Sequence, residues 1–460
     1  MSKVAFDLAI IGTGGAAFSA AIRAHELGAD RIALIEQGTL GGTCVNVGCV
    51  PSKTLLAAAR VTDVSRHHSF VGVPHADGLV DLAALVGQKD ELVAEMRQGK
   101  YLDLANLYGF DLIEGQARFH STDEVLVGDR SIRADRFIVA TGAEPALPTI
   151  DGLNDVPVLT SASAMELTEL PEQLLVIGGG FVGLEQAQMF RRLGAEVTLV
   201  GRIAPHAEPE LAGMLADALR AGGIDVHAGR ATRVRTQANQ IIVETGHGAR
   251  LAGSHLLVAT GRRPRTTELD LPAAGIDVDD RGRIITDPQQ RTTNSIVYAA
   301  GDVTAAHQFV YLAAAQGAIA AENAITDQGS TVDLAGLPQV IFTDPQLASA
   351  GLTEAQAHVQ GWDTDSRVLP LDKVPRAVVE HDTRGAIKIV ADKHTHRVLG
   401  IHALAANAGD LMLAATYAIR SQMTVEDIAL TWAPYLTYAE GIRLTARSFD
   451  HDVERLSCCA

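Results

Sequence analysis

The chain has 460 residues, of which 47% are hydrophobic, so it is long enough to bury the cores of several domains. Its formal net charge of −17 argues against a nucleic acid or an anionic membrane as a partner. The sequence opens directly on a strand pattern, and no apolar run approaches the roughly 20 residues that span a bilayer. We therefore expect no signal peptide and no membrane helix, and predict a cytoplasmic location.

The first predicted elements are a strand, a glycine turn and a helix in FDLAIIGTGGAAFSAAIRAHELGADRIALIEQ, followed by a strand that ends at Glu36. Gly12, Gly14 and Ala17 have the spacing of a dinucleotide-binding βαβ unit. Such glycines let backbone N–H groups approach a pyrophosphate at the helix N-terminus. A carboxylate at the end of the second strand accepts hydrogen bonds from ribose hydroxyls. Glu36 therefore suits the adenosine ribose of FAD or NAD.

Two cysteines follow in GGTCVNVGCVPSK, where four residues separate Cys44 from Cys49. Pro51 predicts the start of a helix over SKTLLAAAR. A helix N-terminus stabilises a thiolate, so Cys49 is predicted to be the better thiolate of the pair. In a reducing compartment, few and paired cysteines indicate catalysis or metal binding rather than structural disulfides.

A second βαβ unit lies in QLLVIGGGFVGLEQAQMFRRLGAEVTLVGR, with the same glycine spacing over residues 178–183. With the ends of the two strands aligned, Gly201 has the position of Glu36, and Arg202 follows it. A guanidinium in place of a carboxylate favours a 2′-phosphate, and hence NADPH over NADH. A solvated charge at a strand end is the alternative interpretation of Arg202.

Three further strands end in glycine turns: FIVATGAEPALP, LLVATGRRPRT and SIVYAAGDVT, the last of which leads into Gly301 and Asp302. With these motifs in this order, the sequence resembles the pyridine nucleotide–disulfide oxidoreductase family along its whole length. The resemblance implies an α/β fold with two Rossmann-like domains, for FAD and NADPH, and a C-terminal α+β dimerisation domain. The implied domains are 1–150 (FAD, first part), 151–270 (NADPH), 271–336 (FAD, second part) and 337–460 (dimerisation, with a Cys-Cys tail).

The resemblance also implies residue roles around the flavin. Asp302 is expected to bind the ribityl chain of FAD. Cys49 is expected to lie against the flavin and exchange electrons with it, while Cys44 faces the substrate. Lys53 is expected to approach the flavin and to pair with Glu185. The predicted cofactor-binding residues are Gly12, Gly14, Gly15, Ala17, Glu36, Thr43, Lys53, Ala117, Thr141, Gly142, Asp302, Val310, Gly178, Gly180, Phe181, Gly183, Arg202 and Gly261.

The segment WAPYLTYAEGIRL bears on the substrate. Family members that reduce glutathione disulfide or oxidise dihydrolipoamide carry His-Pro-Thr-x-x-Glu here, and the His shuttles protons. Aligned on Pro434, this chain has Ala433 at the His position and Tyr438 at the Glu position, with Glu440 two residues beyond. Alanine cannot transfer a proton, so an ordinary disulfide substrate is disfavoured.

The chain ends in RLSCCA, which places Cys458 and Cys459 on its tail. Thiolates select soft metal ions, and Hg(II) favours two-coordinate thiolate binding. The replaced His, the PYLT segment and the terminal pair together resemble the family members that reduce Hg(II) to Hg(0) in mercury detoxification. The resemblance implies that the tail delivers Hg(II) to Cys44 and Cys49, acting at the partner subunit's flavin site in a homodimer, with Tyr435 near the metal. The predicted catalytic residues are Cys44, Cys49, Cys458, Cys459, Tyr435, Lys53 and Glu185, and the four cysteines are the predicted metal ligands.

Several points stay open in the sequence. Many relatives that reduce Hg(II) carry an N-terminal metal-trafficking domain, which this chain is expected to lack, so its source of Hg(II) is open. Phe181 stands where many relatives have Tyr, and is expected either to flip and admit the nicotinamide or to serve packing alone. An NADPH-dependent disulfide reductase of the thioredoxin-reductase or glutathione-reductase type is the alternative function. A soft-metal binder without catalysis is a second rival.

Overall fold

The computed structural model describes residues 4–76, 78–305 and 307–451. No helix within these ranges is long and apolar enough to cross a membrane. The chain forms two compact units, each assembled from separate stretches. The first comprises Met1–Thr54, Ala83–Leu147 and Gly261–Asp333, and the second comprises Leu55–Leu82, Pro148–Thr260 and Leu334–Ala460.

The first unit is built on a seven-stranded sheet with the order β3-β2-β1-β6-β5-β4, and β16 pairs with β6. Strands β1, β2, β3, β6 and β16 run parallel to one another. Strand β5 runs antiparallel to both of its neighbours, β6 and β4. Side chains of β1 alternate between two cores: Leu8 and Ile10 face one, Ala9 and Ile11 the other. The strands are β1 Val4–Ile11, β2 Ile32–Glu36, β3 Asp111–Glu114, β4 Ala117–Ser121, β5 Glu124–Val127, β6 Arg130–Val139 and β16 Val297–Ala299.

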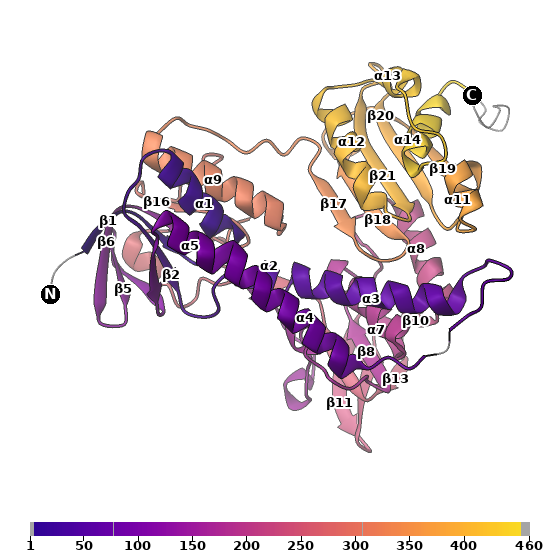
Figure 1. The fold of residues 1–460 in the computed structure, drawn as a ribbon, viewed down its shortest axis with the longest axis horizontal. Helices are drawn as coiled ribbons and strands as arrows, with labels where there is room; N and C mark the ends of the chain where they lie inside the picture. The colour runs from indigo at the N-terminus through magenta and orange to yellow at the C-terminus, as the bar shows by residue number, and fades with distance from the viewer. Residues whose placement is uncertain (1–3, 77, 306, 452–460) are drawn as a thin grey trace. The chain divides into compact units, whose positions relative to one another are not determined.

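Helices α1 (Gly15–Glu26) and α9 (Val310–Thr326) pack side by side against this sheet (Figure 1). Their backbones approach closely because a Cβ on Gly317 would lie 2.0 Å from the carbonyl oxygen of Ala16. Arg23 also joins the two helices, with its Nη2 atom 2.6 Å from Glu322. The other helices that begin in this unit or flank it are α2 Gly42–Asn46, α3 Cys49–His67, α4 Leu82–Arg97, the π-helix Gln98–Leu102 and α5 Asp103–Tyr108.

The second unit contains a parallel sheet with the order β10-β9-β8-β14, flanked by α7 and α8, and an antiparallel sheet β11-β12-β13. Helix α7 connects β8 to β9, as the second βαβ pattern predicted. The elements are β8 Gln173–Ile177, α7 Phe181–Leu193, β9 Glu196–Val200, α8 Pro209–Ala221, β10 Ile224–His227, β11 Ala231–Gln237, β12 Gln240–Thr245, β13 Arg250–Gly253 and β14 His255–Val258.

The C-terminal part of the second unit is an antiparallel sheet with the order β17-β18-β21-β20-β19, on which α12 and α14 pack (Figure 1). Its core is continuous, from Ile387 and Ile401 in the sheet to Met412 and Ile442 in the helices. The elements are β17 Pro338–Ile341, β18 Gln346–Gly351, α10 Glu354–Val359, β19 Thr364–Pro370, α11 Pro375–Val379, β20 Ala386–Asp392, β21 Val398–Ala405, α12 Ala408–Arg420, α13 Val425–Leu430 and α14 Tyr438–Arg447.

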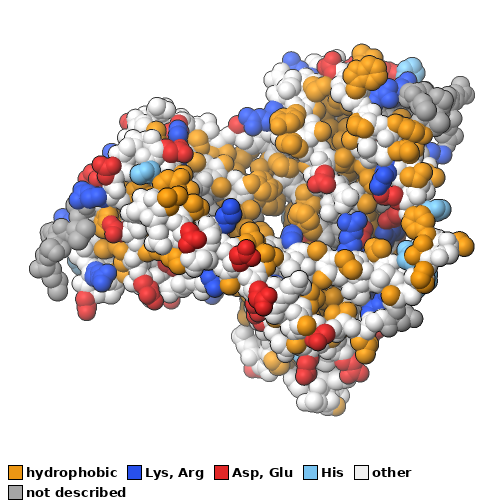
Figure 2. All heavy atoms as spheres, viewed as in Figure 1, with side chains coloured by type: hydrophobic (Ala, Val, Ile, Leu, Met, Phe, Trp, Pro, Cys, Tyr) orange, Lys and Arg blue, Asp and Glu red, His pale blue; other side chains and the backbone are white. Residues whose placement is uncertain are grey.

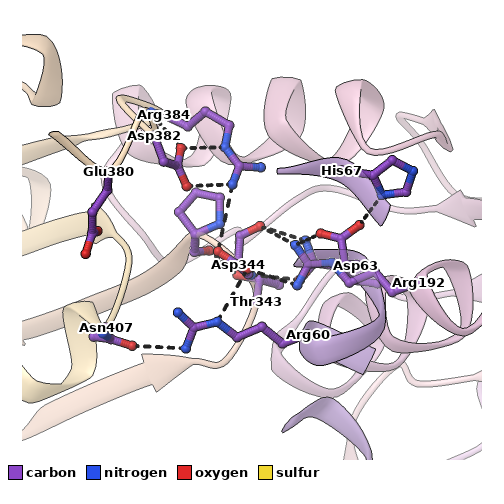
Figure 3. A network of polar contacts seen from close by, with 12 residues as sticks. Arg60, Asp63, His67, Arg192, Thr343, Asp344, Glu380, Asp382, Arg384 and Asn407 are labelled. Carbon is purple, nitrogen blue, oxygen red and sulfur yellow. Dashed lines mark hydrogen bonds and ion pairs between the residues drawn. The ribbon is translucent and has the colours of Figure 1, made fainter. Parts of the chain in front are cut away.

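A polar network joins three parts of the second unit (Figure 3). Arg192, at the end of α7, lies 3.1 Å from Asp344 and 2.9 Å from Asp63 of α3. Arg60 of α3 and Arg384, before β20, each lie 3.9 Å from Asp344. Because Arg192 is nearly buried, with 10% of its side chain exposed, these pairs are only partly screened by water. The network thus ties α3 and α7 to the C-terminal sheet.

The predicted fold class is confirmed: two Rossmann-like sheets are present, together with a C-terminal α+β part. The two compact units divide the chain differently from the predicted domain limits at two places. Residues 261–270 group with the first unit because β15 (Arg262–Pro264) pairs with β7 (Ala143–Pro145). Residues 55–82 group with the second unit.

Candidate flavin, nucleotide and thiol sites

The first glycine turn is lined by backbone. Gly12 has a φ of +116°, and a Cβ there would lie 2.3 Å from the carbonyl oxygen of Ala140, so only glycine fits. A Cβ on Gly42 would lie 2.6 Å from the Cα of Gly14, so the backbone at Gly42 also lies close to the turn. The N-terminus of α1 therefore opens onto a cradle without side chains, which is what a pyrophosphate requires.

Glu36 lies beside this cradle. The Thr13 hydroxyl donates a 2.5 Å hydrogen bond to the Glu36 carboxylate, and the backbone N–H of Gly38 donates to the same carboxylate at 2.9 Å. Thr13 in turn accepts a hydrogen bond from the backbone N–H of Gly41 at 3.1 Å. The carboxylate at the end of β2 is thus held in place, and this arrangement fits the adenosine ribose of FAD.

Asp302 follows β16 in the first unit, and Arg262 lies 3.7 Å from it. Burial raises the pKa of Asp302, and the charge of Arg262 opposes this effect. Burial lowers the pKa of Arg262, with Asp302 opposing. A carboxylate with one nearby cation and little water around it can accept hydrogen bonds from the hydroxyls of a ribityl chain.

Other predicted cofactor-binding residues lie in the same unit. A Cβ on Gly15 would lie 3.1 Å from a methyl group of Val310, so these two positions meet at the starts of α1 and α9. Thr141 donates a 2.8 Å hydrogen bond to the carbonyl oxygen of Arg265. Ala17 is buried in α1, and Thr43 lies in α2. Three further predicted positions are Ala117, buried in the outermost strand β4, Gly142, which precedes β7, and Gly261, which precedes β15.

The two thiols of the first unit interact with each other. Cys44 lies in α2 and is half-buried, while Cys49 is the first residue of α3 and is exposed. A side-chain hydrogen bond with Cys49, burial and the charge of Cys49 raise the pKa of Cys44 far above its ordinary value. This direction is consistent with the prediction that Cys49 is the thiolate of the pair. Lys53 follows Cys49 by one turn of the same helix and favours ionisation of Cys44.

The second glycine turn repeats the geometry of the first. Gly12 donates its backbone N–H to Ile35 at 2.8 Å, and Gly178 donates its backbone N–H to Val200 at 2.9 Å. Ile35 and Val200 are thus equivalent, which confirms that Gly201 has the position of Glu36. Arg202, the next residue, is exposed.

The other glycines of this turn have distinct surroundings. A Cβ on Gly183 would lie 1.9 Å from the carbonyl oxygen of Gly178, so α7 packs directly on the turn. Apart from Gly180 itself and its two chain neighbours, no heavy atom of the described residues lies within 4 Å of a Cβ built on Gly180, so the helix N-terminus is open there. Phe181 is half-buried at the first position of α7. This open, helix-capped turn fits the pyrophosphate of a second dinucleotide.

Two of the remaining predicted catalytic residues, Glu185 and Tyr435, lie in the second unit. Glu185 is buried in α7, and its carboxylate accepts the backbone N–H of Phe342 at 3.0 Å. Its pairing with Lys53 stays a prediction. Tyr435 lies half-exposed in the turn before α14. Cys458 and Cys459 lie outside the described residues, and among those that are described no group of three or more His, Cys, Asp or Glu side chains could hold a metal ion.

The segment that replaces the family's His-Glu motif makes its own contacts. Tyr438, at the Glu position, is buried and donates a 2.9 Å hydrogen bond to Glu380. The buried carboxylate of Glu440 accepts the backbone N–H of Leu436 at 3.3 Å. Leu436 has a φ of +60°, and this contact supports its left-handed backbone. Glu440 therefore holds the turn that carries Tyr435, and no imidazole occupies position 433.

Three residues that were not predicted from the sequence lie beside these sites. Thr13 stands at the variable position between Gly12 and Gly14, and its hydroxyl could have indicated a hydrogen bond beside the turn. Arg262 directly follows the Ala-Thr-Gly turn in LLVATGRRPRT, and this position could have indicated a role beside the site. Burial, followed by the charges of Cys44 and Cys49, raises the pKa of Tyr101, whose ring packs edge-on against Phe18 at 4.9 Å. Nothing in the sequence connects Tyr101 with the thiols, because the approach depends on the fold.

Comparisons with known proteins agree with this architecture. Residues 6–320 match the pyridine nucleotide-disulphide oxidoreductase family, and residues 337–446 match the dimerisation domain of that family. The HOCl-induced flavoprotein disulfide reductase RclA from Escherichia coli is similar in structure, with a TM-score of 0.86 and 30% identity, over 96% of this chain and 99% of that one.

Curated relatives are more similar in sequence. The mercuric reductase of Bacillus cereus is 48% identical over 463 residues, which cover 99% of this chain and 73% of the relative. The mercuric reductase of Streptomyces lividans is 46% identical over 467 residues, which cover 99% of this chain and 98% of the relative. That of Staphylococcus aureus is 46% identical over 462 residues, which cover 99% of this chain and 84% of the relative. The two glycine turns, the thiol pair at the start of α3 and these matches lead to one conclusion: the chain belongs to the pyridine nucleotide-disulphide oxidoreductase family.

Proposed function

We propose that this chain is an NADPH-dependent flavoenzyme that reduces Hg(II) to Hg(0) through Cys44 and Cys49. The observation that carries the proposal is a thiol pair without a proton-shuttling imidazole. Cys44 and Cys49 interact at the start of α3, yet Ala433 stands where disulfide reductases of the family have His, and Tyr438 is engaged with Glu380. Mercuric reductases at 41–48% identity over nearly the whole chain support the same substrate.

FAD and NADPH are the proposed cofactors, and when bound they supply the two electrons that the reaction needs. In the first unit, the turn at Gly12–Gly15 would hold the pyrophosphate of FAD, Glu36 its adenosine ribose and Asp302 its ribityl chain. In the second unit, the turn at residues 178–183 would hold the pyrophosphate of NADPH, and Arg202 its 2′-phosphate.

The two inner thiols bind the ion by ligand exchange. Hg(II) arrives with two external thiolates, and the sulfurs of Cys44 and Cys49 displace them one after the other, so that two thiolates enter and two leave. Cys44 passes its proton to an external thiolate that leaves as it binds, and Lys53 favours this ionisation electrostatically. Reduction by two electrons gives neutral Hg(0) and returns both cysteine sulfurs to the thiolate state. Since no leaving thiol must be protonated at this step, the chain does not need the missing His.

Delivery of the ion is assigned to the terminal pair. We assign Cys458 and Cys459 to capture Hg(II) from solvent thiols, and Tyr435 to orient the ion by its hydroxyl without transferring a proton. Both would act at the partner subunit's flavin site, so each site would need two chains. A cytoplasmic location stays a prediction from the sequence.

Surface apolar residues support association of two chains through the dimerisation domain. Leu413 and Tyr417, one turn apart on α12, have 60% and 62% of their surface exposed, and Leu430 and Trp432 have 83% and 98% exposed. Figure 2 shows hydrophobic side chains distributed over the visible face of the C-terminal part. Side chains of this size on one domain favour burial against a second copy.

NADPH oxidation on addition of HgCl₂ with excess thiol tests the proposal. The purified protein should be yellow, NADPH should bleach it in the absence of air, and Hg(II) should restore the colour while Hg(0) vapour is released. Glutathione disulfide and a protein disulfide serve as competing substrates. Turnover of either disulfide at a rate equal to or above that of Hg(II) would assign the chain to the disulfide reductases instead.

A further inference from the structure

A buried lysine lies in the second unit, away from the residues of the proposed reaction. Lys388 of β20 has 1% of its side chain exposed. Its ammonium group lies 2.9 Å from Glu208, 2.9 Å from Glu354 and 3.1 Å from Glu210. Glu208 is equally buried, at 2%, whereas Glu210 and Glu354 are 45% and 31% exposed. The pair of Lys388 and Glu208 is therefore the dry centre of this cluster.

The contacts of Glu208 fix it further. Its other oxygen accepts the backbone N–H of Glu354 at 2.7 Å. The ring of His402 lies 3.8 Å away and donates to the carbonyl oxygen of Leu352 at 2.9 Å. Burial lowers the pKa of Lys388, but its hydrogen bonds to Glu208, Glu354 and Glu210 outweigh that effect, so the ammonium stays charged. Removing Lys388 leaves Glu208 as an uncompensated buried charge, whereas removing Glu208 leaves Lys388 paired with Glu210 and Glu354 but detaches the loop end from it.

Glu208 also ends the loop that carries Arg202. This loop, residues 201–208, connects β9 to α8, whose first residue is Pro209. Near its start, it lies on the second glycine turn: the backbone N–H of Ala204 donates to Gly179 at 2.8 Å. A Cβ on Gly179 would lie only 2.3 Å from the carbonyl oxygen of Arg202. The loop is thus held at one end by the glycine turn and at the other by Lys388.

From this arrangement, we infer that Lys388 and Glu208 are positioning residues for the nucleotide site, which hold the 201–208 loop so that Arg202 meets a 2′-phosphate. The inference rests on the proposed function, because it takes Arg202 as the group that recognises NADPH. Arg202 is exposed, so its reach is set by the backbone of the loop rather than by packing of its own side chain. Preference for the phosphorylated nucleotide is then partly determined by β20 of the C-terminal sheet.

The chain offers a matched control. The Arg192–Asp344 pair joins α7 to the segment between β17 and β18, so it also connects the nucleotide-binding part to the C-terminal part (Figure 3). It contacts neither the 201–208 loop nor Lys388 in the contacts described. Asp344→Asn should therefore lower stability, as loss of a partly buried ion pair does, without changing recognition of the 2′-phosphate.

The test compares two ligands that differ only in this phosphate. Calorimetry measures the dissociation constants of adenosine 2′,5′-bisphosphate and adenosine 5′-phosphate for the wild-type holoenzyme and for the variants Glu208→Ala, Lys388→Met, Asp344→Asn and Arg202→Ala. In the wild type, the bisphosphate should bind more than tenfold tighter. Glu208→Ala and Lys388→Met should weaken the bisphosphate at least fivefold while changing the monophosphate less than twofold. Flavin content and thermal unfolding show whether each variant is folded.

The possible results separate the inference from the proposed function. The decisive quantity is the dissociation constant of the monophosphate divided by that of the bisphosphate. If this ratio is unchanged in folded Glu208→Ala and Lys388→Met while Arg202→Ala lowers it, the inference is overturned. If Arg202→Ala itself leaves the ratio unchanged, the assignment of NADPH to Arg202 fails and the inference fails with it. Should Glu208→Ala and Lys388→Met not fold, Glu208→Gln decides, because it removes the charge of Glu208 and retains its shape. The inference is also overturned if the ratio falls as much in Asp344→Asn as it does in Glu208→Ala.

Discussion

The Thr13 hydroxyl lies 2.5 Å from the Glu36 carboxylate and joins the first glycine turn to the end of β2. Thr13 occupies the variable position of the glycine motif, so the turn that would hold a pyrophosphate also orients the acid that would hold a ribose. The equivalent carboxylate is absent from the second turn, where Gly201 stands at the same position and Arg202 follows.

Replacing Glu36 by Ala should weaken FAD binding at least tenfold, because a hydrogen bond to a charged group contributes about 1.5–3 kcal/mol. Release of flavin on dilution, followed by its fluorescence, measures the effect. Glu114 is the control, since it ends the neighbouring strand β3, pairs in register with Glu36 and is exposed. Glu114→Ala should retain its flavin, and equal loss from both variants would contradict the role of Glu36.

The wild-type protein should use NADPH well over tenfold more efficiently than NADH, in terms of kcat/KM. Arg202→Ala should lose most of this preference, because a charge-assisted phosphate contact contributes about 1.5–3 kcal/mol. Arg220→Ala is a matched control, since Arg220 is an exposed arginine of the same unit that pairs with Asp217. Equal efficiency of NADPH and NADH in the wild type would refute the assignment.

Two-electron reduction should produce a long-wavelength absorption band from the Cys49 thiolate beside the flavin, and Cys49→Ser should abolish it. The raised pKa of Cys44 keeps that thiol protonated, so it donates a hydrogen bond that favours the Cys49 thiolate. Cys44→Ala removes this donor and cannot form a disulfide, so its Cys49 thiolate should give the band with oxidised flavin before any reduction. That band should disappear at a higher pH than the band of the reduced wild type as the solution is acidified. A spectrophotometric pH titration measures both midpoints, and persistence of the band in Cys49→Ser would reverse the two assignments.

The double variant Cys458→Ser/Cys459→Ser should bind FAD and be reduced by NADPH as the wild type is. Turnover should fall severely when Hg(II) is offered as its glutathione complex, because two incoming thiolates are needed to displace two outgoing ones. The defect should shrink with bromide complexes, from which the ion can pass directly to Cys44. Steady-state NADPH oxidation with both forms of the metal provides the comparison, and unchanged turnover of the thiol complex would show that the inner pair acts alone.

Much of the architecture could be predicted from the sequence because its signals are local. The glycine spacing after β1 and β8 predicts a tight turn, a helix and a dinucleotide, because a Cβ on Gly12 or Gly178 would strike a carbonyl oxygen just after a neighbouring strand. The start of α3 close to Cys49 followed from Pro51 in the same way. The absence of His at position 433 required only an alignment on Pro434.

The remaining features depend on residues that are far apart in the chain. Lys388 follows Glu208 by 180 residues, and a lysine in a strand pattern predicts a solvated charge until folding brings three carboxylates to it. Tyr101 approaches Cys44 and Cys49 only because its ring, in the π-helix Gln98–Leu102, packs against Gly41 at the start of α2. The sequence by itself thus determined the two nucleotide turns, the thiol pair and the family, because each depends on backbone geometry within a few residues. Only the tertiary structure decided which charges are buried together, because burial depends on every element that packs around them.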